Sequence, residues 1–246
     1  GEQVAASTAP LWTALMGLLA GLPGALFLWA KFAGIAAQAA SVLLVFTVAR
    51  RLDLSPSRAA VAAALVAASD WLVWSALSGM EVNLFVLLML GGLARHLRER
   101  AAPPGGELPP LSFLLFGLAA LARPEGLLLP LLAAADRLLR IGPRAPAAPR
   151  ASGAAPAADD DVALRLAAPT RPAWIGAGAG ILLTLLVLAP VAFAFHSMSG
   201  SYLPTTVAAK SAGPPMLLPD FRLLAAIAGI LLASQPWMTL LALGGV

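Results

Sequence analysis

Long apolar runs separated by short polar breaks are the feature of this sequence that most limits its fold. The 246-residue chain is 60% hydrophobic and only 11% charged, whereas a soluble domain is roughly 45–50% apolar and about 25% charged. A soluble enzyme, a disordered chain and a nucleic-acid-binding domain are therefore poor descriptions of it. Because a helix needs about 20 apolar residues to cross the hydrocarbon core, we predict an all-α, polytopic transmembrane helical bundle.

The apolar runs predict about six to seven membrane helices. The first run, residues 11–22, is too short to cross a bilayer and is closed by Pro23-Gly24, so we expect a half-helix or an interfacial helix there. Arg123-Pro124-Glu125 interrupts a later run, and because proline removes a helical hydrogen bond, we expect two short helices that meet at this turn. The other predicted helices are 25–48, 59–77, 82–93, 111–121, 126–139, 173–195 and 223–246.

Basic residues are concentrated in three of the loops between these runs. Loops 49–58, 94–110 and 136–171 hold twelve of the 16 Lys and Arg residues, which places them on the cytoplasmic side of a plasma (inner) membrane protein. The net charge of +4 therefore reports membrane topology, and we expect a bilayer and no nucleic acid as partner. Within this arrangement, residues 140–171 have the composition of a disordered cytoplasmic linker, and 197–221 form an extracytoplasmic loop.

This topology brings four polar elements to the extracytoplasmic face. They are residues 1–8, 78–83, 123–125 and 197–210. A site assembled from several polar turns at one membrane face suits an enzyme that acts on lipid-linked substrates. The chain has no cysteine and two histidines, so we predict no disulfide and no metal site built on cysteine or histidine.

Four residues of these turns are candidates for binding an anionic substrate. Glu81 either complements the dipole of the helix that it precedes or lies at the mouth of a membrane cavity, where ionisable groups tend to be functional. Arg123 and Glu125 either form an ion pair that caps the turn, or Arg123 faces a phosphate, which guanidinium groups bind in a bidentate manner. Both interpretations can hold together, since Glu81 is expected beside the same turn. Lys210 is either a lysine that reaches for the interface or a phosphate or pyrophosphate contact.

Asp70 lies inside the predicted span 59–77, next to two tryptophans. It is either a site residue in a wet cavity or part of a helix break near the outer interface, where tryptophan is enriched. We favour the helix break. His196 ends a predicted span, and we expect it at the outer interface.

Taken in order, several short motifs resemble a known family. The chain is similar to the GT-C class of membrane glycosyltransferases, in particular to bacterial arabinofuranosyl- and mannosyltransferase-like members that use polyprenyl-phosphate sugars. The resemblance extends from Gly1 to about Lys210. The motifs are Gly1-Glu2-x-Val4-x-x-x-Thr8-x-Pro10-Leu11-Trp12, Ala49-Arg50-Arg51-Leu52, Ser78-Gly79-Met80-Glu81, Leu121-Ala122-Arg123-Pro124-Glu125-Gly126 and Leu203-Pro204-x-Thr206-x-x-Ala209-Lys210.

The resemblance implies an inverting transfer of a sugar from a polyprenyl-phosphate donor to a glycan, lipid or protein acceptor on the extracytoplasmic face. It implies that Arg123 and Lys210 bind the lipid phosphate, while Glu81 and Glu125 position these groups or the sugar hydroxyls. The general base of such enzymes is an acidic residue of the first outer loop, which is expected upstream of Gly1. The chain, residues 1–246, is thus expected to be a partial GT-C-like domain, truncated at both ends, that uses no organic cofactor; a divalent metal stays open.

Two other functions fit parts of the pattern. A transporter or flippase-like carrier would have broken helices and polar residues at the membrane midplane, but here the polar turns gather at one face. A non-catalytic membrane scaffold is the other alternative.

Overall fold

A computed structural model of the chain describes residues 8–102, 109–139, 141–142, 165–166 and 171–202. These residues form eight α-helices, one short 3-10 helix and one antiparallel pair of two-residue strands, which confirms the predicted all-α class. The elements in chain order are α1 (Pro10–Leu19), α2 (Leu26–Arg51), α3 (Pro56–Ala67), α4 (Asp70–Ser78), α5 (Val82–Arg100), α6 (Ser112–Ala122), η1 (Pro124–Leu127), α7 (Leu128–Leu139), β1 (Ile141–Gly142), β2 (Arg165–Leu166) and α8 (Arg171–Ser199).

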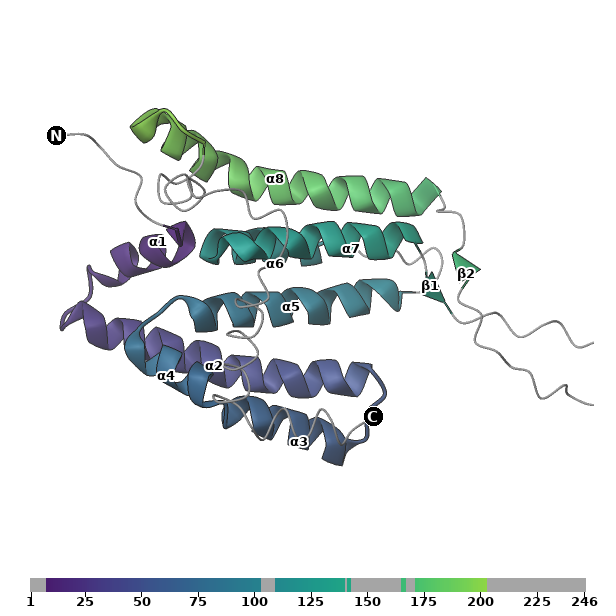
Figure 1. Cartoon of the computed structure of the whole chain (residues 1–246), viewed down its shortest axis with the longest axis horizontal. Helices are drawn as coiled ribbons and strands as arrows, with labels where there is room; N and C mark the ends of the chain where they lie inside the picture. Colours follow the sequence, from purple (N-terminus) through teal and green to yellow (C-terminus); the bar gives the residue numbers. More distant parts are fainter. Residues whose placement is uncertain (1–7, 103–108, 140, 143–164, 167–170, 203–246) are drawn as a thin grey trace, which may run out of the picture.

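The long helices lie side by side and give the bundle two distinct ends (Figure 1). We call the end at which α2 and α5 finish the basic end, because exposed arginines lie there. At the opposite end, which we call the turn end, α4 meets α5 and α6 meets η1. The arginines of the basic end on α2, α3 and α5 are Arg50, Arg51, Arg58, Arg95, Arg98 and Arg100.

The expected number of membrane helices is wrong for the described residues. Two helices, α2 and α8, are long and apolar enough to cross a membrane, and a third span results if the bent pair α3 and α4 counts as one. The reason is that several apolar runs form shorter or more polar helices than a span requires. Helix α5 carries three arginines and a glutamate in its last third, and α6 and α7 have 11 and 12 residues. The predicted helix 223–246 lies outside the described residues.

Helix α1 has ten residues, which at 1.5 Å per residue is about 15 Å. That length is half of a bilayer core and agrees with the half-helix expected for the first apolar run. Helix α8 extends to Ser199, so the loop predicted to begin at residue 197 begins slightly later. Of the predicted linker 140–171, the structure describes the two strands and the first residue of α8.

The break between α3 and α4 shows how the run 59–77 is divided. The two helices are bent by 49°. At the break the carbonyl oxygen of Val66 accepts the backbone N–H of Ser69 at 3.3 Å and the Nε2 of Gln38 of α2 at 2.9 Å. Asp70 begins α4, and its carboxylate accepts the backbone N–H of Trp71 at 2.7 Å. The interpretation of Asp70 as a helix-break residue is therefore confirmed.

Helices α6 and α7 form the expected hairpin around Arg123-Pro124-Glu125. Ser112 at the start of α6 and Arg137 near the end of α7 both bond Glu99, so the two helices run in opposite directions from the basic end. The turn closes tightly because Gly126 lies against the backbone of α6. A Cβ atom at Gly126 would lie 2.6 Å from the backbone nitrogen of Ala120.

The core lies where α6 packs between α5 and α8. Phe113 and Phe116 are almost completely buried, and Ala133 of α7 joins them. Two glycines make room for these rings, since a Cβ at Gly92 would collide with Phe116 and one at Gly180 with Phe113. The hairpin is thus held by close ring-to-backbone packing, while the outer faces of α2 and α8 carry exposed leucines and phenylalanines.

Candidate functional site

Three predicted site residues meet at the turn end. Arg123 donates its Nη1 to Glu81 Oε1 at 3.1 Å and its Nη2 to Glu125 Oε1 at 3.2 Å. We call these three residues the turn cluster. Glu81 comes from the corner between α4 and α5, and the other two come from the hairpin turn 42 or more residues later in the chain. The sequence-based expectation that Glu81 lies beside the hairpin turn is confirmed.

Local backbone geometry brings the turn cluster together. Gly79 ends α4 in the left-handed region, with φ 70°, and this reverses the chain two residues before Glu81. Arg123 is extended, with φ −151° and ψ 136°, as expected for a residue that precedes proline. Arg123 thus lies where the chain leaves α6, Glu81 lies where it enters α5, and Glu125 lies within η1.

The turn cluster is partly exposed. The side chains of Glu81, Arg123 and Glu125 are 23%, 32% and 62% exposed. Exposed ion pairs contribute about 0–1 kcal/mol, so the contact with Glu125 is easily exchanged. A guanidinium has five N–H donors, and the two ion pairs use two of them. Arg123 can therefore receive an anion from outside.

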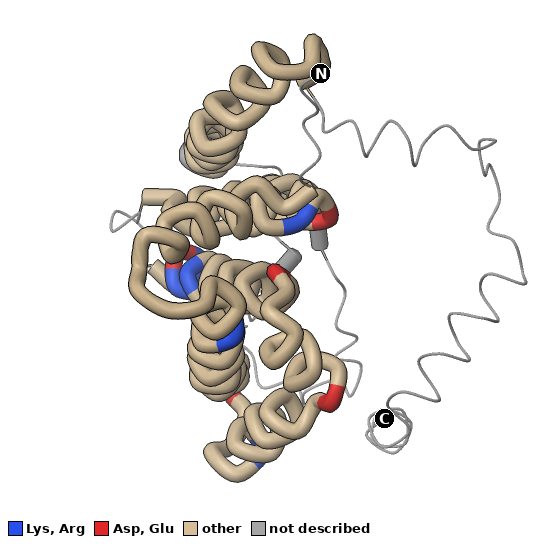
Figure 2. Tube along the Cα trace, turned by 90° about the vertical axis from the view of Figure 1, so that its left-hand side faces the viewer, with Lys and Arg blue, Asp and Glu red and all other residues tan. Residues whose placement is uncertain are grey.

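Figure 2 views the molecule from the turn end and shows the positions of the charged residues on the tube. With two carboxylates and one guanidinium, the turn cluster carries a formal charge of −1. An anionic ligand would have to replace a carboxylate at Arg123 rather than add to it.

The other predicted elements of this face are described in part. Lys210 and residues 1–7 lie outside the described residues. His196 lies at the exposed end of α8, and its ring stacks on Tyr202 at a centroid distance of 4.2 Å. The structure thus brings together two of the four polar elements predicted for this face, 78–83 and 123–125.

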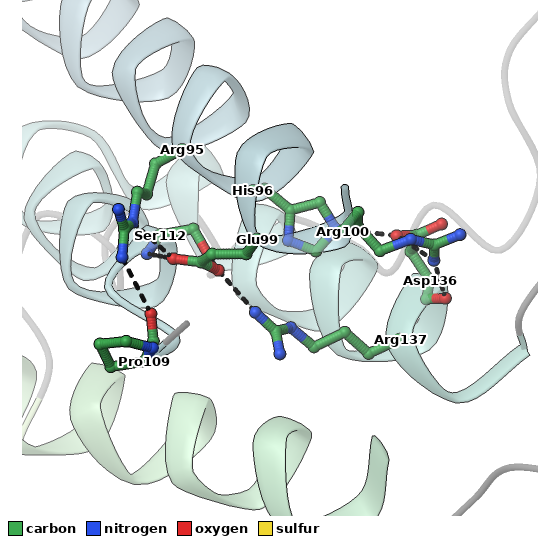
Figure 3. A network of polar contacts seen from close by, with 8 residues as sticks. All are labelled: Arg95, His96, Glu99, Arg100, Pro109, Ser112, Asp136 and Arg137. Atoms are coloured by element: carbon green, nitrogen blue, oxygen red, sulfur yellow. Dashed lines mark hydrogen bonds and ion pairs between the residues drawn. The ribbon is translucent and has the colours of Figure 1, made fainter. Parts of the chain in front are cut away.

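A second polar cluster, which sequence reasoning missed, lies at the basic end (Figure 3). Glu99 has a side chain only 1% exposed. Its Oε1 accepts from Arg95 Nε and from the backbone N–H of Ser112, both at 2.9 Å. Its Oε2 accepts from the Ser112 hydroxyl at 2.6 Å and from Arg137. Because no side chain of α6 itself caps that helix, Glu99 acts as its cap from α5.

Asp136 extends this second cluster toward the surface. It accepts from Arg100 Nη1 at 2.7 Å and lies 2.8 Å from the Nε2 of the buried His96. We call the whole set the base network; its members are Arg95, His96, Glu99, Arg100, Ser112, Asp136 and Arg137. The base network joins the end of α5 to both ends of the hairpin.

The base network is structural rather than a ligand site. Glu99 is buried and fully engaged by groups of the chain itself, which leaves no room for a ligand at its carboxylate. Two features of the sequence could have indicated the base network. They are the i,i+4 spacing of Arg95 and Glu99, and Asp136-Arg137 in the last turn of α7. Sequence reasoning had assigned these arginines to topology alone.

The described part of the chain contains no group of three or more His, Asp or Glu side chains that could hold a metal ion. Comparisons with models of protein families, with curated proteins and with solved structures returned no match for this chain.

Proposed function

We propose that this chain is part of a membrane-bound glycosyltransferase that uses a polyprenyl-phosphate sugar as donor, and that Arg123 binds the phosphate of that donor. One observation carries the proposal. The partly exposed guanidinium of Arg123 lies between Glu81 and Glu125. This end of the apolar bundle is the one opposite the exposed arginines.

The chemistry of the transfer gives Arg123 a defined role. The acceptor oxygen forms a bond to the anomeric carbon of the sugar, while the bond from that carbon to the phosphate oxygen breaks. The polyprenyl phosphate leaves with the electron pair, and the acceptor proton passes to a base. Negative charge grows on the leaving phosphate, and a guanidinium placed in advance stabilises that charge.

The two carboxylates have different roles in this proposal. Glu81 is the less exposed of the two and keeps the guanidinium oriented. Glu125 is largely exposed and yields its place to the phosphate. Lys210, outside the described residues, remains a proposed second phosphate contact from the sequence motif.

The proposed orientation follows from charge. The exposed arginines lie at the basic end, and such residues prefer the cytoplasmic side of a membrane. The turn cluster then faces the extracytoplasmic side, where a polyprenyl-phosphate sugar and its glycan, lipid or protein acceptor would meet.

The test uses the full-length protein in proteoliposomes that contain a polyprenyl-phosphate sugar. We expect Arg123→Ala to lower the rate of sugar transfer by roughly 100-fold or more, as for loss of one preorganised donor. Arg123→Lys keeps the positive charge but loses the bidentate geometry of the guanidinium, so its rate should lie between those of Arg123→Ala and the wild type. The exposed Arg98 of the basic end provides a matched control, because Arg98→Gln removes a charge far from the turn cluster. Transfer at the wild-type rate in Arg123→Ala would refute the proposal.

The broken pair α3 and α4 favours a second candidate, a carrier for lipid phosphates. Discontinuous helices with polar groups at the break are typical of transporters. Within the described residues, three buried oxygen atoms on α2, α4 and α5 have no hydrogen-bond partner, those of Gln38, Ser75 and Asn83. The same proteoliposomes separate the two functions, since a carrier moves labelled polyprenyl phosphate across the bilayer without transferring sugar.

A further inference from the structure

Asn83 is a buried polar residue beside the turn cluster, and the proposed phosphate site does not use it. It lies in the first turn of α5, two residues after Glu81, and it is completely buried. Its Nδ2 donates to the carbonyl oxygen of Leu72 in α4 at 3.0 Å. Its Oδ1 has no hydrogen-bond partner within the described part of the chain. One half of this amide is therefore buried in an apolar bundle without compensation.

The stability of the bundle does not explain an amide at this position. The carbonyl oxygen of Leu72 lies inside α4, where the backbone N–H of Ala76 is its helical partner, so it does not need a bond from Asn83. The buried Oδ1 is unfavourable without a donor. A leucine has a similar shape and no polar atoms, and such replacements are often neutral or stabilising. What the amide does supply is a directed contact between α5 and α4.

Helix α4 is a fixed support for this contact. It lies so close to α2 that a Cβ at Gly34 would be 2.7 Å from the carbonyl oxygen of Ala76. In the corner that follows, the backbone bonds are long, 3.3 Å from Met80 and 3.4 Å from Gly79. The shorter bond from Asn83 therefore fixes the first turn of α5 on α4.

We propose that Asn83 is a positioning residue, which holds the first turn of α5 on α4 so that Glu81 keeps Arg123 in place for the donor phosphate. This inference rests on the proposed function. Glu81 begins α5, so a shift of the first turn of that helix moves its carboxylate. Glu81 Oε1 lies 3.1 Å from Arg123 Nη1, a distance that leaves little room for a shift before the hydrogen bond is lost.

The experiment measures kcat/KM for the polyprenyl-phosphate sugar with the full-length protein in proteoliposomes. We expect Asn83→Leu to lower kcat/KM about tenfold, because small displacements of a binding group are costly to the rate. Its midpoint of thermal unfolding should stay the same or rise, since the unpaired Oδ1 is removed. Ser41→Ala of α2 is the control. It also removes one buried hydrogen bond to a helix carbonyl, that of Ala37, and should leave kcat/KM unchanged.

A second pair of variants separates positioning from a general structural role. If Asn83 acts through Glu81, then Asn83→Leu should change kcat/KM by at most about twofold in a protein that already carries Glu81→Ala. The same tenfold loss in both backgrounds would assign Asn83 to the structure of the bundle and overturn the inference. Asn83→Ala replaces Asn83→Leu in this comparison if the leucine variant does not fold.

The outcomes also distinguish this inference from the proposed function. Wild-type kcat/KM in Asn83→Leu, together with a loss of transfer in Arg123→Ala, overturns the role of Asn83 and leaves the proposed function standing. Wild-type values in both variants overturn both. A loss in Asn83→Leu with wild-type transfer in Arg123→Ala also overturns both, because the effect of Asn83 would then not pass through Arg123.

Discussion

At the scale of single residues, Glu99 illustrates what a carboxylate requires inside an apolar bundle. Its two oxygens accept from Arg95, Arg137 and both the hydroxyl and the backbone N–H of Ser112. Four donors offset the loss of water, and a charge without them would be strongly unfavourable. The carboxylates of the turn cluster need fewer hydrogen-bond donors from the protein, because they keep contact with solvent.

We expect Glu99→Gln to lower the free energy of unfolding by about 3 kcal/mol or more. The amide keeps the shape of the side chain but leaves Arg95 and Arg137 without their counter-charge. Unfolding of the purified protein in detergent, followed by circular dichroism, measures the change. Arg98→Gln is the control, for which a change of at most about 0.5 kcal/mol is expected at an exposed position. Equal stability of both variants would show that the base network does not hold the hairpin.

The residues that sequence could and could not predict differ in how their partners are encoded. Glu81 and Arg123 were predicted to share one face because both interrupt apolar runs. Such an interruption can be recognised in the sequence without a structure. Glu99 was missed because its partners lie on three helices, and its neighbours in the sequence are arginines that topology alone explains. The roles of Glu81, Arg123, Glu125 and Lys210 in binding remain predictions.

At the scale of elements, the turn of the hairpin depends on a glycine. The turn folds back so closely that Gly126 touches the backbone of Ala119 and Ala120. The position needs the absence of a side chain, and an added methyl group would force the 3-10 turn away from α6.

Gly126→Ala is expected to destabilise the protein by roughly 1–3 kcal/mol, the usual effect of overpacking. Gly178 of α8 offers a matched control, since a Cβ there meets nothing within 4 Å. Gly178→Ala should be neutral or stabilising by about 0.5–1 kcal/mol, because alanine favours the helix. Thermal unfolding of the two variants side by side measures the difference. The close packing of the turn would be contradicted if Gly126→Ala were as stable as Gly178→Ala.

The elements also show why the number of spans was overestimated. Apolar runs were counted as helices of full length, yet composition does not reveal where a run bends or folds back. The run 59–77 bends at Ala68 and Ser69, and the hairpin helices α6 and α7 have 11 and 12 residues, about half of the number that crosses a bilayer core. The sequence was sufficient to predict the all-α class, the positions of most helices and the turn at Arg123. It was not sufficient to predict the lengths of the helices, because these depend on tertiary contacts such as that of Gln38 with Val66.

At the scale of the whole molecule, the two ends differ in charge, and we expect this difference to set the orientation in a membrane. The chain has no cysteine, so single-cysteine variants report each end without background. Arg58→Cys marks the basic end, and Leu22→Cys, in the exposed loop before α2, marks the turn end.

We expect an impermeant maleimide to label Leu22→Cys from outside intact cells and Arg58→Cys only after the membrane is opened. The reason is the preference of arginine-rich loops for the cytoplasmic side. Labelling of Arg58→Cys from outside intact cells would reverse the orientation and place the turn cluster on the cytoplasmic face.

In the proposed orientation, the pairing within the hairpin turn has a consequence for membrane insertion. Both ends of the hairpin lie at the basic end, so its turn would enter the bilayer from the cytoplasmic side. Arg123 and Glu125 have opposite charges two residues apart, and their contact would make the entering turn neutral as a unit. A lone guanidinium would oppose this step strongly. Glu81 would add its charge only when the hairpin meets α5, so the negative charge of the turn cluster would arise when the bundle closes.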